Sequence, residues 1–249
     1  SARDMAKEWV PELFRQGQRV MVRVNSLDTG LTRSELETLV SPDLYGISLG
    51  KVESKWNIRD VDRMLSAIEP LAGVELGSTK VVAWAETASA LVDARDIADS
   101  SQRVIALAFG AEDFTNDMGI ERSDSGDEVQ VPRSLVPVAA RAANVASLDS
   151  PFVAFQDPEA LRADAQKARQ MGFTGKHAIH PAQLDIINEV FSPAPDEVAY
   201  ARRIMDAWDK AEAEGRGSLA LDGRMVDVPV VKRAQNLLAF ADAIEAQGH

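Results

Sequence analysis

The chain has 249 residues and contains no Cys, which excludes disulfides, thiolate metal sites and a cysteine nucleophile. Hydrophobic residues make up 45% of it, enough for a sizeable core, and its 39 acidic residues outnumber its 27 Lys and Arg residues. The resulting formal charge of −12 disfavours nucleic acid and anionic membranes as partners. No apolar run approaches the roughly 20 residues of a membrane span and no signal peptide opens the chain, so a soluble, cytoplasmic protein is expected.

In chain order, an opening helix at 2–15 is followed by short apolar runs that alternate with amphipathic stretches. Gly, Pro, Asp or Ser bound the apolar runs, which is typical of buried parallel strands. Strands are predicted at 19–24, 45–49, 80–85, 104–109, 152–155 and 176–179. Helices are predicted at 33–40, 58–68, 88–98, 134–143 and 158–171. This alternation predicts an α/β fold with a parallel sheet, and the length is near the roughly 250 residues of a (β/α)₈ barrel.

The pattern changes after Pro193. A long helix is predicted at 196–214, followed by a Gly-rich, hairpin-like stretch at 215–225 and a final helix at 230–246. The sequence therefore predicts a barrel domain at 1–193 and a C-terminal helical extension at 194–249. We expect this extension to contact a neighbouring subunit and to cover the active site.

Polar residues follow the apolar runs at equivalent points. They are Arg23 and Asn25, Lys51 and Glu53, Glu86, Glu112 and Asp113, and His180. In a parallel barrel the carboxyl ends of the strands form the active-site face, so charged groups there are typical of catalysis or ligand binding.

Glu86 and Asp113 form the most informative pair, because they follow successive strands and a barrel would bring their carboxylates together. Two hard oxygen ligands at a barrel mouth suit Mg²⁺, which completes its octahedron with water and substrate. The alternative is that these carboxylates cap the helices that follow them.

Three further polar residues each have two interpretations. Arg23, inside a Val-Arg-Val-Asn strand, would clamp a carboxylate or enolate, or form a structural ion pair with Glu53 or Glu112. Lys51 would form a Schiff base, although an ion pair with an acidic neighbour fits better. His180 would act as acid or base, although a hydrogen bond to its own loop is the favoured interpretation.

Other chemistries find no support in the sequence. No Gly-rich phosphate loop follows a strand, and no Ser-His-Asp order with an elbow motif occurs. The four Trp residues are interpreted as packing residues at core positions.

Six segments, in order along the chain, resemble the citrate lyase β-subunit-like family. They are Val-Arg-Val-Asn (22–25), Gly-Lys-Val-Glu-Ser (50–54), Ala-Glu-Thr-Ala (85–88), Phe-Gly-Ala-Glu-Asp-Phe-Thr-Asn-Asp-Met-Gly (109–119), Gly-Phe-Thr-Gly-Lys-His-Ala-Ile-His-Pro-Ala-Gln (172–183) and Asp-Gly-Arg-Met-Val-Asp-Val-Pro (222–229). Each segment is short, but together they span nearly the whole chain.

This resemblance implies a TIM (β/α)₈-type barrel that binds Mg²⁺, acts on thioesters of coenzyme A or acyl carrier protein, and forms a homo-oligomer, usually a trimer or hexamer. It places Glu86 and Asp113 on the two metal-binding carboxylates and Arg23 on the substrate-binding arginine. It also places Asp227 on an acidic residue that, in the lyases, reaches the active site of an adjacent subunit.

The sequence departs from the family pattern in three respects. The family normally begins with two more βα units, which are absent here, so we expect this sequence to be a shortened form of a longer barrel. Gly50 stands where a Pro is usual, and Ser89 stands where many relatives carry a charged residue. The two substitutions bear on substrate choice more than on chemistry.

The resemblance implies a carbon–carbon lyase that cleaves or condenses a 3-hydroxyacyl-CoA, such as citramalyl-CoA or malyl-CoA, with acetyl-CoA and a 2-oxo acid as products. Arg23 would offset charge on the enolate or carboxylate, and Asp227 would move a proton. A malyl-CoA thioesterase and a citrate lyase β-type subunit that depends on an acyl-carrier partner remain alternatives. A metal aldolase that acts on free 2-oxo acids is a third.

Overall fold

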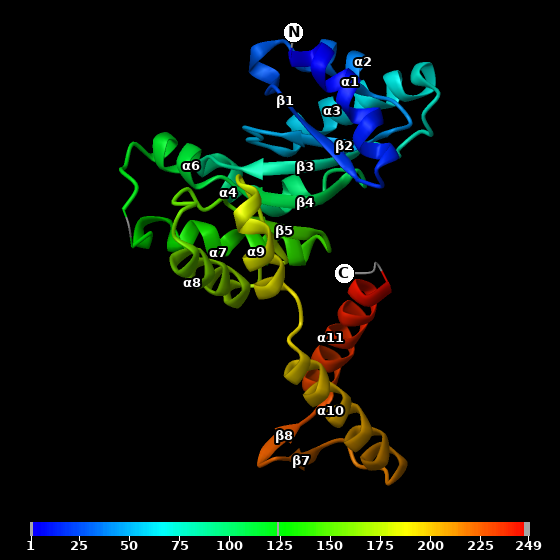
Figure 1. Ribbon diagram of the computed structural model, residues 1–249, viewed down its shortest axis with the longest axis vertical. Coiled ribbons are helices and arrows are strands. Elements are labelled where there is room, and N and C mark those ends of the chain that lie inside the picture. The colour runs from blue at the N-terminus through cyan, green and yellow to red at the C-terminus, as the bar shows by residue number, and fades with distance from the viewer. Residues whose placement is uncertain (1, 124, 247–249) are drawn as a thin grey trace. The chain divides into compact units, whose positions relative to one another are not determined.

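The computed structural model describes residues 2–123 and 125–246 (Figure 1). The chain divides into two compact units, which are described separately. The first unit comprises Ser1–Ala154 and Lys167–Ile179, and the second comprises Phe155–Gln166 and His180–His249. Among the described residues, none of the helices combines the length and apolar character needed to cross a membrane.

The first unit is built on a curled sheet of six parallel strands, each paired with the next in sequence (Figure 1). The strands are β1 (Val20–Val24), β2 (Leu44–Leu49), β3 (Lys80–Ala85), β4 (Val104–Phe109), β5 (Ala146–Asp149) and β6 (Gly175–Lys176). Sequential order with a helical connection after each strand is the (β/α) barrel pattern, here as a partial barrel of six strands. The predicted α/β class and parallel sheet are confirmed.

Helices connect the strands. They are α1 (Ala2–Arg15), η1 (Leu27–Thr29), α2 (Thr32–Leu39), α3 (Lys55–Ile68), η2 (Glu69–Ala72), α4 (Ala88–Val92), α5 (Ala94–Ala98), α6 (Ala111–Met118), α7 (Asp127–Ala142) and α8 (Pro158–Met171). The predictions for the opening helix and for 158–171 match α1 and α8. The stretch predicted as one helix at 88–98 is two short helices, because the chain breaks at Asp93.

The prediction of a strand at 152–155 is wrong, because the fifth strand is Ala146–Asp149. The apolar side chains that suggested it, Val153 and Phe155, are 61% and 43% exposed. Asp149, at the end of the true strand, is fully buried. Because this strand ends in a buried carboxylate, its sequence resembles that of a polar loop.

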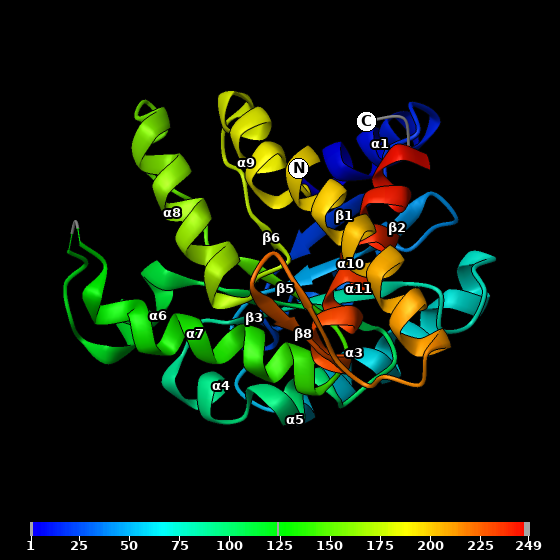
Figure 2. The same cartoon turned by 90° about the horizontal axis from the view of Figure 1, so that it is seen from below.

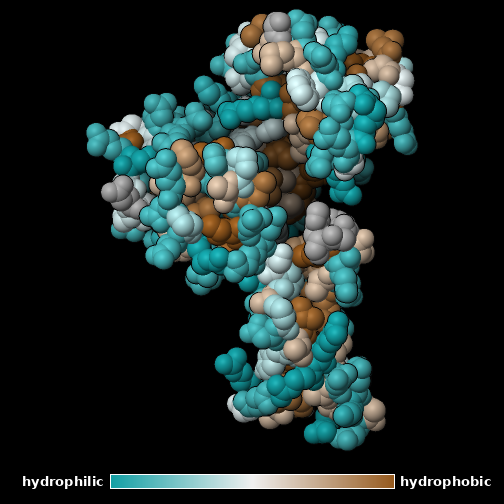
Figure 3. Space-filling view, viewed as in Figure 1, coloured by the Kyte–Doolittle hydropathy of each residue, from teal (hydrophilic) through white to brown (hydrophobic). Residues whose placement is uncertain are grey.

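The two faces of the sheet have different surroundings. Helices α5 and α7 pack against β3, β4 and β5, and lie together on one side of the sheet in Figure 2. Side chains between these layers, such as Leu107 and Phe109, are fully buried. Alternate residues of the same strands, including Trp84 and Ala108, form a second buried cluster on the opposite, inner face. The face shown in Figure 3 is largely hydrophilic, with scattered hydrophobic patches.

At the amino ends of the strands, charged groups are buried and fully paired. Glu69 of η2 is completely buried and accepts hydrogen bonds from the backbone of Gly77 and Thr79 and from both terminal nitrogens of Arg103. Arg103, which precedes β4, also donates to Asp62. These contacts hold the pKa of Glu69 at about 2, against the desolvation that would raise it.

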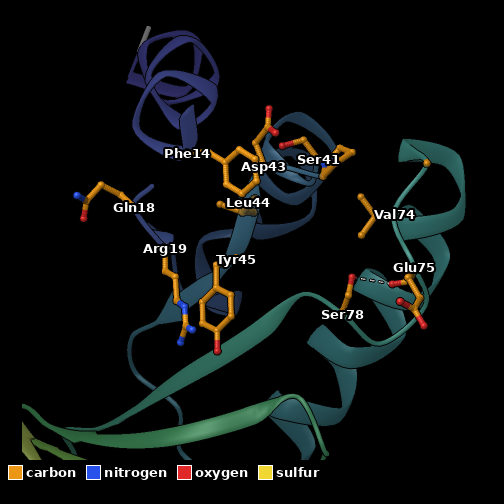
Figure 4. A pocket seen from close by; sticks show the side chains of 12 residues that line it. Phe14, Gln18, Arg19, Ser41, Asp43, Leu44, Tyr45, Val74, Glu75 and Ser78 are labelled. Atoms are coloured by element: carbon orange, nitrogen blue, oxygen red, sulfur yellow. Dashed lines mark hydrogen bonds between the residues drawn. The ribbon is translucent and has the colours of Figure 1, made fainter. Parts of the chain in front are cut away.

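A cavity of about 450 Å³ also lies at the amino ends of β1 and β2 (Figure 4). Phe14 of α1, Arg19 and Tyr45 contribute to its lining, and the Arg19 guanidinium lies 5.7 Å from the centre of the Tyr45 ring. In barrels of this kind the amino face usually contributes to stability, and the carboxyl face carries the catalytic groups.

The second unit contains η3 (Pro181–Gln183), α9 (Leu184–Phe191), α10 (Pro195–Ala213), α11 (Val228–Ala246) and a hairpin of β7 (Leu219–Leu221) and β8 (Arg224–Val226). The predictions of a long helix, a hairpin and a final helix are thus confirmed within a few residues. Helices α10 and α11 pack on one another around a small apolar core that includes Ile204 and Val226. The second unit also includes 155–166, so its limits differ from those of the predicted extension at 194–249.

Candidate active site at the carboxyl ends of the strands

Glu86 directly follows β3, and its side chain is only 1% exposed. Its Oε1 accepts a hydrogen bond of 2.6 Å from the backbone N–H of Lys51, which follows β2. The next helix is capped by another residue, since Thr87 Oγ1 accepts from the Ala90 N–H. The capping interpretation of Glu86 is therefore wrong, and its carboxylate faces the neighbouring strand end instead.

Asp113 lies in the first turn of α6, close enough for its charge to act on Glu86. Burial raises the pKa of Glu86, and the negative charge of Asp113 raises it further. The Lys51 N–H and the charges of Arg23 and Lys51 oppose this rise. The charge of Asp113 thus acts on Glu86, whereas a metal site shared by the two carboxylates stays a prediction.

A divalent cation fits this pair of carboxylates. Mg²⁺ usually takes one or two protein carboxylates, and a cation between two mutually repelling anions would relieve the unfavourable burial of Glu86. No cluster of three or more His, Asp or Glu side chains suited to a metal occurs in the described residues. Two carboxylates alone would leave the remaining coordination positions of such a cation to water and substrate.

Two glycines fit closely around the Glu86 carboxylate. A Cβ at Gly110 would lie 2.6 Å from Glu86 Oε2, which is too close for any other residue without movement of the carboxylate. A Cβ at Gly50 would lie 3.0 Å from Glu86 Oε1 and 3.2 Å from Arg23 Nη2. The bare Gly50 backbone thus lies against both the carboxylate and the guanidinium. The departure of the sequence from the family at Gly50 falls directly at this site.

The loop after β2 also holds strained backbone. Lys51 has a φ of 51°, in the left-handed region that ordinary L-residues avoid. This conformation accompanies the hydrogen bond of its N–H with Glu86, while its side chain stays exposed. Strain of this kind is common at functional sites.

Arg23 belongs to β1, and its guanidinium lies 5.5 Å from the centre of the Trp84 ring. The Trp84 indole donates a hydrogen bond of 2.7 Å from Nε1 to Ser48 Oγ on β2. In the described part of the chain Arg23 forms no ion pair with Glu53 or Glu112, and Glu112 pairs with Arg122 instead. A guanidinium held on an aromatic ring without a carboxylate partner is available to an anionic ligand.

Trp84 also contacts His177, which the sequence analysis did not single out. The two rings stack with centroids 4.5 Å apart and an interplanar angle of 18°. Spacing in the sequence could not have found this contact, because β3 and the residue after β6 meet only through the curl of the sheet. The interpretation of Trp84 as a buried packing residue is confirmed, but Trp9 and Trp56 are each 55% exposed.

The remaining predicted residues have other surroundings. His180 Nδ1 accepts a hydrogen bond from the Ala182 N–H, and its ring stacks on Phe155, so the favoured interpretation of a loop contact is confirmed. Asp227 belongs to the second unit, where its carboxylate accepts a bond of 3.3 Å from the Val230 N–H at the start of α11. Its role in an active site stays a prediction.

Comparison with known proteins identifies the family. The model of the HpcH/HpaI aldolase/citrate lyase family matches residues 1–181. The chain belongs to this family. It is 32% identical over 252 residues to the citrate lyase subunit beta of Leuconostoc mesenteroides subsp. cremoris, covering 100% of this chain and 83% of that protein. It is 34% identical over 228 residues to a (3S)-malyl-CoA thioesterase of Cereibacter sphaeroides, covering 91% of this chain and 75% of the relative.

A solved structure of the same family aligns with the fold. The protein CitE of Mycobacterium tuberculosis, in complex with magnesium, acetoacetate and coenzyme A, superimposes with a TM-score of 0.72 at 29% identity. The match covers 89% of this chain and 78% of that protein. The resemblance inferred from six short motifs is thus confirmed as family membership.

Proposed function

We propose that this chain is an Mg²⁺-dependent carbon–carbon lyase that cleaves or condenses a 3-hydroxyacyl-CoA, such as citramalyl-CoA or malyl-CoA, with acetyl-CoA and a 2-oxo acid as products. The observation that carries the proposal is the buried Glu86 carboxylate, beside Asp113 and the Arg23 guanidinium, at the carboxyl ends of successive strands. The magnesium and coenzyme A bound to the related CitE protein support it.

In this proposal each residue has a defined task. Glu86 and Asp113 hold Mg²⁺, which when bound acts as a Lewis acid toward the substrate oxygens and as a template for the 2-oxo acid. Gly50 and Gly110 keep the Glu86 carboxylate in place. Arg23, oriented by Trp84, offsets negative charge on the carboxylate or enolate as the carbon–carbon bond breaks.

Asp227 is the proposed proton carrier for the enolate carbon, supplied by a neighbouring copy in a trimer or hexamer. Replacement of Asp227 by Asn should lower turnover but leave Mg²⁺ affinity unchanged, whereas equal turnover of the two proteins would exclude Asp227 from catalysis.

Replacement of Glu86 by Ala tests the metal site. Turnover of the CoA thioesters of malate and citramalate should fall by about 10³-fold or more, and Mg²⁺ binding measured by calorimetry should be lost. Glu112→Ala is the matched control, because Glu112 is an exposed carboxylate one residue from Asp113. A Glu86→Ala enzyme that still turns over and is indifferent to Mg²⁺ would refute the proposal.

A second candidate function is hydrolysis of the thioester, and the 34% identity to a malyl-CoA thioesterase favours it. Water would then attack the thioester carbonyl in the same site. The products decide between the two functions, since the lyase releases acetyl-CoA and a 2-oxo acid whereas the thioesterase releases malate and free CoA. The name of the Leuconostoc relative supports a third version, a lyase subunit that needs an acyl-carrier partner. Turnover of an acyl-CoA by the purified chain alone would exclude it.

A further inference from the structure

The Nε2 atom of His177 is buried and has no hydrogen-bond partner among the described residues. A buried polar atom without a partner costs about 1–3 kcal/mol, so such atoms are rare in folded proteins and call for an explanation. Either the fold tolerates this cost at His177, or a molecule that binds there supplies the partner.

The surroundings of His177 connect it to the active site. Its ring lies on Trp84, and the same indole carries the Arg23 guanidinium. Trp84 also adjoins the metal pair, because a Cβ at Gly110 would lie 3.4 Å from Trp84 Cε3 and 2.6 Å from the Glu86 carboxylate. Residues from β1, β3, the start of α6 and the end of β6 therefore surround one indole ring.

The position of His177 limits which part of the substrate can contact it. Trp84 precedes Glu86 by two residues, so both side chains point to the same face of the sheet, and the Cβ position at Gly110 lies close to both the Trp84 ring and the Glu86 carboxylate. A CoA thioester must approach from the open edge of the sheet, because its pantetheine and nucleotide are too large for the interior. The acid end of the substrate, which the metal pair would hold, is therefore the part that lies nearest to Trp84 and His177.

His177 is also suited to a neutral hydrogen bond. Burial lowers its pKa, and the nearby cations Lys176 and Arg23 lower it further against the opposing charge of Asp149. The Asp149 carboxylate is itself occupied by Lys176 and Arg133, so it does not serve the imidazole. The ring is thus a desolvated neutral imidazole, which can donate to or accept from a ligand oxygen.

We propose that His177 is a further substrate-contacting residue, whose Nε2 forms a hydrogen bond with an oxygen of the small acid half of the substrate beneath the metal pair. This inference rests on the proposed function, because it assumes that a 2-oxo acid occupies the site. It assigns a binding role to a histidine whose ring stacks on Trp84 and whose backbone N–H donates to the Asp149 carbonyl.

Calorimetric titration of Mg²⁺ alone, and then of pyruvate, oxaloacetate and glyoxylate in saturating Mg²⁺, tests the proposal. His177→Leu should weaken binding of at least one of these acids by roughly 10–100-fold, the loss expected for a hydrogen bond to a charged ligand. Mg²⁺ affinity should stay within about twofold of that of the unmodified protein. Thr79→Val is the control, because it removes a buried hydroxyl at the amino end of β3, away from the site.

Two conservative variants keep the test decisive if the leucine variant fails to fold. Gln places its amide nitrogen near the position of Nε2, whereas Asn is too short to reach it. His177→Gln should therefore bind the acid within about fivefold of the unmodified protein and better than His177→Asn. Equal losses in these two variants would overturn the proposal.

The other outcomes separate this inference from the proposed function. If the unmodified protein binds a 2-oxo acid and His177→Leu binds it equally well, this inference alone is wrong. Loss of Mg²⁺ binding together with acid binding would also overturn it, because His177 would then only support the metal site. If the unmodified protein binds none of these acids in Mg²⁺, both the inference and the proposed function fall.

Discussion

A buried glutamate lies at each end of β3, Glu69 in η2 at the amino end and Glu86 just after the carboxyl end, and the two have opposite surroundings. Near the amino end, Glu69 accepts two backbone and two guanidinium hydrogen bonds, and its pKa is about 2. At the carboxyl end, Glu86 accepts one backbone hydrogen bond, and burial together with the charge of Asp113 raises its pKa. Full pairing stabilises the fold, whereas incomplete pairing leaves a carboxylate ready for a ligand.

Strained, crowded or unpartnered groups also lie at the carboxyl end of the sheet. The carboxyl end contains the left-handed Lys51, the unpartnered Nε2 of His177, and two glycines where a Cβ would crowd the Glu86 carboxylate. Each of these features costs stability in the isolated chain. Among the described residues the amino end also has a left-handed residue, Asn144, and an unpartnered buried hydroxyl, Thr79 Oγ1, so the clearest contrast between the two ends is the pairing of their charged groups.

Breaking the ion cluster at the amino end should have the largest effect on stability. Arg103→Met leaves Glu69 buried without a cation, and the free energy of unfolding should fall by about 3–5 kcal/mol in urea titrations. Arg63→Met is the control, because the exposed Arg63–Asp60 pair contributes at most about 1 kcal/mol. The double variant Arg103→Met, Glu69→Leu should recover part of the loss. A single variant as stable as the unmodified protein would show that this cluster does not stabilise the fold.

The pH dependence of the free energy of unfolding tests the same ion cluster, because a Gln in place of Glu69 removes the charge but keeps the packing. The folded pKa of Glu69, about 2, lies below its ordinary value of 4.5, so its ionised form stabilises the folded state. That contribution, up to about 3 kcal/mol, is fully present above pH 4.5 and is lost as the pH falls toward 2. Glu69→Gln should therefore be less stable at pH 7 and approach the unmodified protein near pH 2. A constant difference across this range would contradict the assigned pKa.

The sequence predicted those parts of the fold in which the residue pattern and the environment agree. Strands β3 and β4 are continuous apolar runs buried on both faces, and their predicted bounds match those observed. Strand β5 was misplaced because it ends in Asp149, whose burial depends on Arg133 and Lys176 from distant segments. A buried charge is recognised only when its partners are known, and no local pattern supplies them.

Prediction of the candidate site from the sequence meets the same limit. The influence of the Asp113 charge on Glu86 agrees with the strand order from which the pair was predicted, whereas joint metal binding by the two carboxylates stays a prediction. The stack of Arg23, Trp84 and His177 depends on side-chain directions from three strands, which spacing does not encode. Asp227 came only from the family resemblance, and its position in the second unit leaves that role a prediction.

Removal of the Glu86 charge at the carboxyl end should raise the free energy of unfolding, whereas removal of charge at the amino end should lower it. In metal-free buffer at pH 7, Glu86→Gln relieves the repulsion from Asp113 and the burial of a poorly paired carboxylate. We expect the free energy of unfolding to rise by about 1–2 kcal/mol while Mg²⁺ binding is lost. Asp113→Asn should give a smaller gain, because Asp113 is less buried. A loss of stability in Glu86→Gln would mean that Glu86, like Glu69, is a structural group.

The smallest expected effect concerns the backbone of Lys51. Glycine tolerates a φ of 51° and retains the N–H that binds Glu86, so Lys51→Gly should raise the free energy of unfolding by about 0.5–1 kcal/mol. Lys51→Ala keeps the strain but removes the cation, and comparison of the two variants separates backbone from charge. Asn144→Gly, at the other end of the sheet with a φ of 57°, should gain less, because Asn already tolerates this conformation. If Lys51→Gly gains no more than Asn144→Gly, the strain beside Glu86 is not a cost specific to the site, and the contrast between the two ends depends on charge alone.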